Sequence, residues 1–557
     1  MPSSELTVGV ALIKLLEQYR VKHVFGIPGV HTIELYRGLA GSSIQHHTPR
    51  HEQGAGFMAD GYARVSRQPG VCFVITGPGL TNIATPMGQA LADSIPMLVI
   101  SSVNDTITSP QAQGMLHEMP DQLALSAQVA RYSETISSAD DLAAALAKAF
   151  NLFASSRPGP VHLQLPVSLL GSPANPSLIA EQPQLASRPV ASVAEVKAAA
   201  GLLKNAQHPT ILAGGGSVEA SQQVRLLAEK LNAPVHMTIN ARGVLPFSHE
   251  LAVPASCTYH SVREVLNESD VVLALGTELS ATDYDQFKDD QFKISARLVR
   301  CDIDPLQINN NFTAELSLVG DVGLTLQKLL DEIDLVEQDS DRAGLEVSAT
   351  VKKDNNGESS GVSRARRSMQ ALAQMSAPER RHLQILEAMR DQIPDCIFVG
   401  DSTQMIYSGN MIFNTHEPGR WFNSSVGFGT LGYALPAATG AALASDNAPV
   451  VCLIGDGGMQ FVLGELGALK DTGKAVAVVV WCNGGYLEIK NSMERADVSA
   501  VGVEFTVPDY LSVARAYGID SVRASNAQEI CTAIQQHYEK NVPVVVVVDE
   551  EQALQAG

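Results

Sequence analysis

Short apolar runs, most of them rich in Val and Ile, recur along the chain between longer segments with helical periodicity. The runs lie at 23–26, 71–76, 97–101 and 161–165, at 210–213, 271–274 and 298–302, and at 397–400, 450–454, 475–481 and 544–548. Continuous apolar runs that alternate with helices are typical of parallel sheets buried on both faces. The pattern predicts an α/β protein with three doubly wound parallel-sheet domains, at residues 1–175, 190–335 and 381–557.

The stretch between the second and third domains, residues 336–380, is polar and contains few large apolar side chains. It includes the segments KKDNNGESSG and SRARRS, whose composition favours a solvated chain. The sequence predicts a surface linker here, with a pair of weakly patterned helices as the alternative.

Composition narrows the classes of partner. The 557 residues carry a formal charge of -20, which disfavours nucleic acid and anionic membranes as partners. The apolar runs are far shorter than the roughly 20 residues of a membrane-spanning helix, and the start MPSSELTVGV lacks a signal-peptide pattern. Seven dispersed cysteines without metal-ligand spacing indicate reduced thiols, so we expect a cytoplasmic protein.

The strongest candidate site follows two apolar runs of the third domain. One run ends in Gly455, Asp456, Gly457 and Gly458, and the next ends at Asn483. The carboxyl ends of parallel strands are where open α/β sheets bind ligands. A carboxylate, an amide oxygen and a backbone carbonyl suit Mg²⁺, and the glycines let a diphosphate approach the chain. The alternative for the Gly-Asp-Gly alone is an ordinary turn after a strand.

These residues resemble the thiamine diphosphate (ThDP) motif of the decarboxylase and acetohydroxyacid synthase superfamily, in which Gly-Asp-Gly is followed, after a strand, by paired Asn. Here the pair is Cys482-Asn483, so the first Asn is missing. The resemblance implies pyrimidine-binding, central and diphosphate-binding domains in that order, with Mg²⁺ held by Asp456, Asn483 and the carbonyl of Gly485. It also implies a second diphosphate loop at Asp401, Ser402 and Thr403, for which a plain helix cap is the alternative.

The first domain carries the stretch PRHEQGA at 49–55, with Glu52 where a short strand gives way to a helix. A glutamate at a helix start is commonly no more than a favourable charge. The stretch resembles the superfamily's cofactor-activating segment, which implies that Glu52 shares its proton with the pyrimidine N1′ so that the 4′-nitrogen can remove the C2 proton. The stretch TGPGLTN, which ends at Asn82, is also shared with the family, and we assign Asn82 to the cofactor site.

The third domain contains a second stretch that bears on the pyrimidine ring of the cofactor, GFGTLGY at 427–433. The resemblance implies that the Gly429 carbonyl accepts a hydrogen bond from the 4′-amino group and that Leu431 holds the two rings in a V; otherwise Leu431 is a core residue. Since the facing segments come from two chains in this superfamily, the resemblance implies a homodimer at least, homotetramers being common in the family.

Departures from the family pattern bear on the substrate. Pyruvate decarboxylases have an aspartate after the early Pro-Gly, whereas here Val30 and His31 follow. The synthases bind FAD through an arginine and an Asp-Asp-Arg run in the central domain; residues 276–283 (GTELSATD) lack that arginine, which argues against FAD. The synthases' Phe-Gln-Glu triplet is replaced by Leu-His-Glu at 116–118.

His31, His117 and Glu488 are therefore candidate pocket residues. The histidines could relay a proton to the product carbon, and Glu488 could pair with a cationic substrate tail. A solvated helix-start histidine and a surface ion pair are the alternatives for His31 and Glu488. The whole set resembles the acetolactate-synthase-like 5-guanidino-2-oxopentanoate (2-ketoarginine) decarboxylases, which implies a small 2-oxo acid substrate.

Other outcomes stay open at this stage. Attack on a second 2-oxo acid would make the enzyme an acetolactate synthase-type carboligase instead of a decarboxylase. A dinucleotide-binding oxidoreductase is a remote alternative, because the glycines at 214–216 and 77–79 follow strands but lack the fingerprint spacing. A non-catalytic scaffold is the other, and the presence of both Glu52 and Asp456 argues against it.

Overall fold

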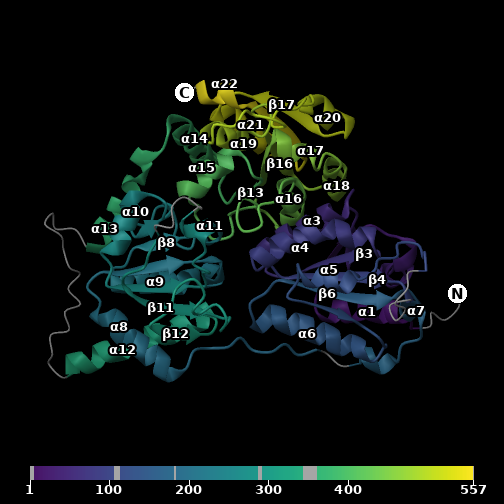
Figure 1. Cartoon of the computed structure of the whole chain (residues 1–557), viewed down its shortest axis with the longest axis horizontal. Coiled ribbons are helices and arrows are strands. Elements are labelled where there is room, and N and C mark those ends of the chain that lie inside the picture. The colour runs from purple at the N-terminus through teal and green to yellow at the C-terminus, as the bar shows by residue number, and fades with distance from the viewer. Residues whose placement is uncertain (1–5, 106–112, 181–182, 286–291, 343–359, 556–557) are drawn as a thin grey trace. The chain divides into compact units, whose positions relative to one another are not determined.

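The computed structural model describes residues 6–105, 113–180, 183–285, 292–342 and 360–555. They form two compact units: unit 1 is made of 1–187, 398–403 and 423–557, and unit 2 of 188–397 and 404–422. The chain builds three six-stranded parallel sheets flanked by helices (Figure 1). This confirms the predicted α/β class with doubly wound sheets.

The first sheet belongs to unit 1 and has the strand order β2-β1-β3-β4-β6-β5. Its strands are β1 (His23–Gly26), β2 (Gln45–His47), β3 (Gly70–Val74), β4 (Met97–Val103), β5 (Tyr132–Thr135) and β6 (Pro160–Pro166). The surrounding helices are α1 (Val8–Gln18), α2 (Ile33–Leu39), α3 (Glu52–Ser66), α4 (Pro78–Ala92), α5 (Gln122–Ala127), α6 (Asp141–Ser155) and α7 (Val167–Gly171). Separate apolar clusters form on the two faces, one under α1 and α6 and the other under α3 and α4.

The third sheet has the order β14-β13-β15-β16-β18-β17, which is the same connectivity as the first. Its strands are β13 (Ile397–Gly400), β14 (Trp421–Asn423), β15 (Val450–Gly455), β16 (Val476–Cys482), β17 (Asp520–Ala524) and β18 (Val544–Asp549). The helices around it within unit 1 are α16 (Ala434–Ala444), α17 (Asp456–Gln460), α18 (Glu465–Thr472), α19 (Leu487–Arg495), α20 (Tyr510–Ala516), α21 (Ala527–Glu539) and α22 (Glu550–Gln555).

Both of these sheets have a point where the strand order reverses. The chain leaves β1 toward β2 on one side and returns to β3 on the other, and it does the same around β13 with β14 and β15. The loop after β1 and the loop after β3 therefore leave the sheet in opposite directions, as do the loops after β13 and β15. Ligands bind in the crevice between such loops. Every candidate residue that follows β1, β3, β13 or β15 lies at one of these two edges.

Within unit 1 the two sheets are joined through helices α3 and α16, which cross in close contact. A Cβ on Gly61 would lie 1.9 Å from the carbonyl oxygen of Ala437, and a Cβ on Gly440 would lie 1.9 Å from that of Met58. Only glycine allows the backbones to approach this closely. The crossing ties the helix that begins at Glu52 to the third sheet of the same chain.

Unit 2 contains the second sheet, of order β12-β11-β10-β7-β8-β9. Its strands are β7 (Pro209–Ala213), β8 (Val235–Met237), β9 (Ala252–Val253), β10 (Val271–Leu275), β11 (Arg297–Asp302) and β12 (Leu316–Val319). The helices of unit 2 are α8 (Val193–Asn205), α9 (Ser221–Leu231), α10 (His260–Asn267), α11 (Ala281–Tyr284), α12 (Val322–Arg342), α13 (Ser360–Ser368), α14 (Ala377–Gln392) and α15 (Gln404–Ile412). The strand order is that of dinucleotide-binding sheets. Here the two loops at its reversal point pack together, with the Gly216 N–H donating to the Gly276 carbonyl at 3.0 Å.

The segment expected to be a surface linker contains helix in its described parts. Helix α12 continues to Arg342, and α13 is held by the buried guanidinium of Arg364, which donates to the Pro209 carbonyl at 2.9 Å and to the Ser269 hydroxyl at 2.8 Å. Residues 343–359, the remaining part, lie outside the described residues.

No helix in the described part of the chain combines the length and apolar character needed to cross a bilayer. All seven cysteines are free thiols, and only Cys482 is partly exposed.

Candidate active site

The Asp456 carboxylate lies at the carboxyl edge of the third sheet. Strands β15 and β16 pair in register, Gly455 beside Trp481, so the residues that follow them meet. Asp456 is 1% exposed and accepts hydrogen bonds from the backbone N–H groups of Gly457 (2.9 Å), Asn483 (3.2 Å) and Gly484 (2.8 Å). Burial raises the pKa of this carboxyl, and the three N–H donors act in the opposite direction by favouring the charged form.

The side chain of Asn483 is the group that indicates a metal site. Its Oδ1 atom is buried and has no hydrogen-bond partner in the described chain. A buried polar atom without a partner is costly, and a bound cation would satisfy it. Gly485, the third predicted ligand, has φ +149° and its Cβ would lie 2.2 Å from the Val503 carbonyl, so no larger residue fits there. One carboxylate, one amide oxygen and a backbone carbonyl are the oxygen donors that Mg²⁺ prefers.

The second loop of this edge follows β13 and is organised by Asp401. The fully buried carboxylate accepts from the N–H groups of Ser402 (2.9 Å) and Ala434 (3.1 Å). Burial raises its pKa to about 6. The carboxylate therefore joins the predicted diphosphate loop to the start of α16.

The two loops approach each other through glycines. A Cβ on Gly455 would lie 2.9 Å from the Thr403 hydroxyl, and a Cβ on Gly458 would lie 2.9 Å from the Asp401 carboxylate. The glycines of the loop after β15 thus lie directly against the Thr403 and Asp401 side chains of the loop after β13, and their backbone N–H groups suit a diphosphate.

Glu52 is the first residue of α3, at the carboxyl edge of the first sheet. Its side chain is largely buried, and one carboxylate oxygen accepts from the Asn82 amide at 2.9 Å. The other oxygen would lie 3.6 Å from a Cβ on Gly79. The helix is capped by His51, whose Nδ1 accepts the N–H of Gln53. Thus Asn82, which we assigned to the cofactor, contacts the candidate activating acid itself.

A residue that the sequence did not reveal supports the start of this helix. Glu465 begins α18, is 2% exposed, and accepts from the N–H groups of Arg50 (2.9 Å) and His51 (3.1 Å) with one carboxylate oxygen. Its other oxygen is buried without a partner, and a Cβ on Gly54 would lie 2.5 Å from the carboxylate. Burial raises the pKa of Glu465 to about 7. A glutamate ten residues beyond a glycine-rich turn has no sequence signature of its own.

The two candidate histidines lie together. The rings of His31 and His117 meet edge to face with centroids 5.4 Å apart, and the His31 Nδ1 atom is buried without a partner. Burial, and secondarily the neighbouring His117, lowers the pKa of His31, so the ring is neutral near pH 7. The turn that presents His117 is closed by Glu118, whose carboxylate accepts the N–H groups of Gln113 and Met115.

Gly429 and Leu431 lie in the loop between β14 and α16. Gly429 is exposed with φ +76°, and Leu431 is only half-buried, which separates it from the core leucines. The loop is braced by the Ser424 hydroxyl, which donates to the Thr430 carbonyl at 2.6 Å.

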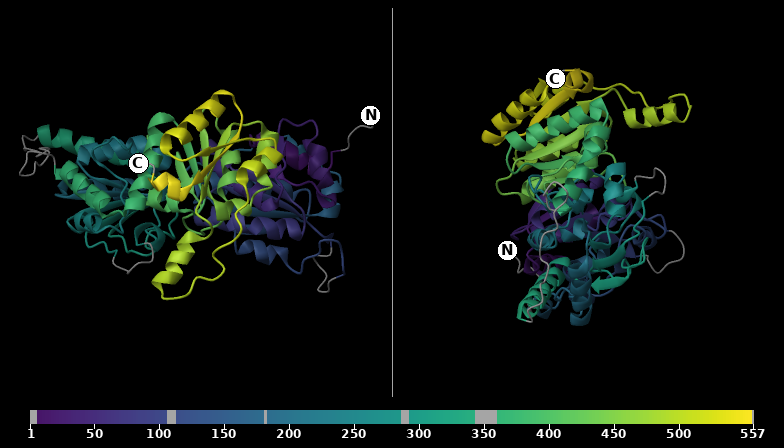
Figure 2. Two further views of the ribbon diagram at one scale, coloured as in Figure 1. Left: turned by 90° about the horizontal axis from the view of Figure 1, so that it is seen from above. Right: turned by 90° about the vertical axis from the view of Figure 1, so that its left-hand side faces the viewer.

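Glu488 lies on α19, a helix without a single buried residue that extends away from the third sheet (Figure 2). Its carboxylate accepts from the Arg495 guanidinium at 2.6 Å. A cationic tail would have to replace this partner.

The structure therefore gathers most of the predicted residues into two groups within one chain, whereas Gly429 and Leu431 lie in the loop before α16 and Glu488 lies on α19. Asp401, Ser402, Thr403, Gly455, Asp456, Gly457, Gly458, Asn483 and Gly485 lie at the edge of the third sheet, and His31, Glu52, Asn82 and His117 at that of the first. Among the described residues, no hydrogen bond joins the Glu52 carboxylate to the Asp456 loop.

Comparison with known proteins assigns the chain to a family through three domain matches. Residues 6–125 match the N-terminal TPP binding domain of thiamine pyrophosphate enzymes, 196–329 their central domain, and 401–548 their C-terminal TPP binding domain. Over 519 residues the chain is 40% identical to a probable 2-ketoarginine decarboxylase of Pseudomonas aeruginosa, covering 93% of this chain and 89% of that protein.

More distant similarity extends to the synthases. The chain is 29% identical over 580 residues to a probable acetolactate synthase large subunit of Methanococcus aeolicus, covering 98% of this chain and 92% of that protein. It is 30% identical over 571 residues to an acetolactate synthase large subunit of Mycobacterium tuberculosis, covering 97% and 88%. The chain belongs to the thiamine pyrophosphate enzymes.

Proposed function

We propose that this enzyme uses ThDP and Mg²⁺ to decarboxylate a 2-oxo acid to an aldehyde, and that its substrate is 5-guanidino-2-oxopentanoate. The observation that carries the proposal is the buried, unpartnered amide oxygen of Asn483 beside the buried carboxylate of Asp456. The higher identity to a probable 2-ketoarginine decarboxylase than to the synthases favours the decarboxylase outcome and this substrate.

Asp456, Asn483 and the carbonyl of Gly485 would hold Mg²⁺, and the loops after β13 and β15 would hold the diphosphate. When bound, ThDP supplies a carbon nucleophile at C2 and accepts the electron pair released with carbon dioxide. Tyr510 steadies the metal loop, because its hydroxyl donates to the Asp456 carbonyl at 2.6 Å.

Glu52 would bond the pyrimidine ring and share a proton with it. The Asn82 amide holds its carboxylate in place, and the apolar and glycine-lined surroundings exclude water from the acid. The start of α4 contacts both this acid and the turn that carries His117: a Cβ on Gly79 would lie 3.6 Å from the Glu52 carboxylate, and a Cβ on Gly77 would lie 2.5 Å from the His117 carbonyl.

A second copy of the chain would complete the site. Within one chain the acid and the metal loop belong to different sheet edges, and large apolar side chains are exposed around both: Val30, Ile33, Leu116, Phe428, Phe461 and Ile489. Exposed apolar surface of this kind marks an interface. We propose a homodimer, or a homotetramer built from it, in the cytoplasm, where its free thiols stay reduced.

The His31 and His117 pair is the feature that favours an aldehyde product. After carbon dioxide leaves, the product carbon must gain a proton, and two adjacent imidazoles can pass one inward from solvent. Glu488 would bind the guanidinium tail in the place that Arg495 takes in the free chain.

The test is a product analysis. Purified protein with ThDP and Mg²⁺ receives 2-ketoarginine, pyruvate, or a 2-oxo acid as long as 2-ketoarginine but with an uncharged side chain. The carbon dioxide, aldehyde and hydroxy-oxo acid that form are measured. We expect fast release of carbon dioxide and 4-guanidinobutanal from 2-ketoarginine only. Acetolactate from pyruvate as the main product would establish the carboligase instead, and no turnover of any 2-oxo acid would refute both.

A further inference from the structure

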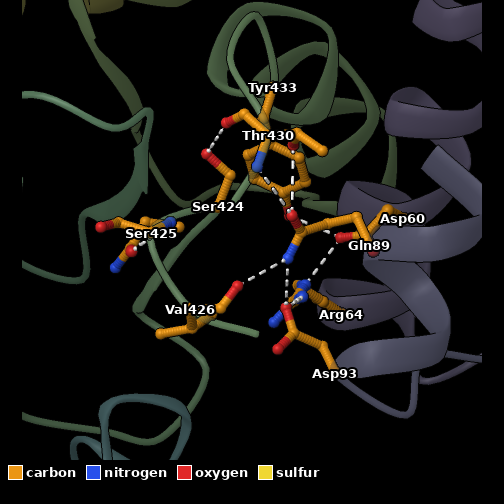
Figure 3. A network of polar contacts seen from close by, with 10 residues as sticks. Asp60, Arg64, Gln89, Asp93, Ser424, Ser425, Val426, Thr430 and Tyr433 are labelled. Atoms are coloured by element: carbon orange, nitrogen blue, oxygen red, sulfur yellow. Dashed lines mark hydrogen bonds and ion pairs between the residues drawn. The ribbon is translucent and has the colours of Figure 1, made fainter. Parts of the chain in front are cut away.

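A buried network joins helices α3 and α4 to the loop of Gly429 and Leu431, inside one chain (Figure 3). Gln89, on α4, is fully buried at its centre. Its Oε1 accepts from the Thr430 N–H (3.3 Å) and hydroxyl (3.1 Å), and its Nε2 donates to the carbonyl of Val426 (3.3 Å) and the carboxylate of Asp93 (3.0 Å). All four hydrogen-bonding positions of one amide are used.

These contacts bracket the residues that the proposed function needs. Val426 and Thr430 lie on either side of Gly429, so one side chain holds both ends of the turn that carries the Gly429 carbonyl. The loop requires outside support, because Gly427, Gly429 and Gly432 all have positive φ angles, of +55°, +76° and +78°. Glycine gives a backbone freedom that other contacts must remove.

Helix α4 also packs directly against the turn. A Cβ on Gly88 would lie 2.7 Å from the Phe428 ring, and a Cβ on Gly427 would lie 2.8 Å from that of Ala92. Because Gly88 and Ala92 already lie against the turn, the turn can pack on α4 in only one position.

Ion pairs fix which way the amide points. Asp93 accepts from the Arg64 guanidinium at 2.5 Å, and Arg64 also donates to Asp60 at 2.7 Å. A carboxylate that is ionised can only accept, so it must face the Nε2 of Gln89, and Oε1 then faces Thr430. The same Asp60 carboxylate accepts from the hydroxyl of Tyr433, at the far end of the loop.

We infer that Gln89 is a positioning residue for cofactor activation: it sets the Gly429 carbonyl and Leu431 against the aminopyrimidine while touching neither substrate nor cofactor. The buried Asp93 carboxylate contacts the amide and fixes its orientation, and the Arg64 guanidinium holds Asp93 while it is itself paired with Asp60. The inference rests on the proposed function, since only there does the Gly429 carbonyl receive the 4′-amino group.

The variant Gln89→Met tests this, because methionine has a similar length and keeps none of the four hydrogen bonds. We expect the exchange of the C2 proton of bound ThDP for deuterium, followed by NMR at saturating ThDP and Mg²⁺, to slow at least tenfold. The control is Gln164→Met, at another buried glutamine of the first domain, whose amide donates to the Thr135 hydroxyl at 2.7 Å. We expect wild-type exchange in the control.

Wild-type exchange rates in Gln89→Met, or equal slowing in both variants in proportion to a loss of folded protein, would overturn the inference. If Gln89→Met does not fold, Thr430→Val, which removes only the hydroxyl bond to Gln89, must slow exchange for the inference to stand. A wild-type protein that binds no ThDP would instead refute the proposed function.

Discussion

The charge state of Glu465 links the pH dependence of stability to the start of helix α3. This carboxyl is 2% exposed, holds the N–H groups of Arg50 and His51, and has a pKa raised to about 7 by burial. In Glu465→Gln the amide oxygen can accept the same two hydrogen bonds, and the amide nitrogen replaces the oxygen that has no partner. The substitution therefore removes the titration and keeps the contact.

The sign follows from proton linkage. The folded state binds the proton more tightly than the unfolded chain, so the stability contributed by Glu465 is complete below the ordinary pKa of 4.5 and is lost as the pH rises to about 7. Between pH 5 and pH 8 the loss amounts to about 2–3 kcal/mol, since one pKa unit corresponds to about 1.4 kcal/mol. Glu465→Gln lacks this loss, so its stability relative to wild type should rise by that amount over the same interval.

Urea denaturation of wild type and Glu465→Gln at pH 5, 6, 7 and 8 measures this difference. Glu529→Gln is the control, because the backbone N–H of Ser525 lowers the pKa of Glu529 from its ordinary value of 4.5. The stability that Glu529 contributes is lost only as the pH falls below that value, so the relative stability of this variant should stay nearly constant from pH 5 to pH 8. Hydrogen exchange of the Arg50 and His51 amides should stay slow in Glu465→Gln and become fast in Glu465→Ala. Parallel pH profiles for wild type and Glu465→Gln would refute the reasoning.

Three further predictions concern the two sheet edges and their junction. Glu52→Gln should reduce turnover by at least ~10², the usual contribution of a positioned acid, with an unchanged circular dichroism spectrum; wild-type turnover would exclude Glu52 as the acid. Asp456→Asn should raise the Mg²⁺ concentration for half-maximal ThDP binding about tenfold or more, because one charged ligand is lost; calorimetry measures this, and an unchanged requirement would place the metal elsewhere. Gly440→Ala should destabilise unit 1 by about 1–3 kcal/mol, because its Cβ would overlap the Met58 carbonyl. Gly201→Ala on α8, where a Cβ meets nothing within 4 Å, is the matched control and should leave the melting temperature unchanged or higher.

The strands that the sequence predicts are those at the centres of the sheets. In the first sheet the apolar runs correspond to β1, β3, β4 and β6, and in the third to β13, β15, β16 and β18, which are the four inner strands of each. The strands that were not predicted in these two sheets, β2, β5, β14 and β17, are all at edges. An edge strand pairs on one side only, and β2, β5 and β17 are partly exposed, so their sequences lack a continuous apolar run. Strand β14 is buried but spans only three residues, which is too short for a recognisable run.

The residues of the candidate site also divide into those that the sequence could predict and those that it could not. Asp456 and Asn483 could be paired from the sequence, because each follows a buried strand and parallel strands end at the same edge. Gln89 and Glu465 could not, because their partners, the backbone of Thr430 and of Arg50, lie hundreds of residues away and carry no pattern.

The sequence by itself determined the three parallel sheets, since the periodicity of apolar runs and helices is a local property of the chain, and its resemblance to a known family indicated the cofactor class. It also placed glycine-rich turns and polar residues at the ends of predicted strands. Only the tertiary structure decided how those ends are supported. The crossing of α3 and α16 at Gly61 and Gly440, the clamp of Glu465 and the network around Gln89 arise where distant backbones approach closely, and hydrogen bonds to backbone groups leave no trace in residue type.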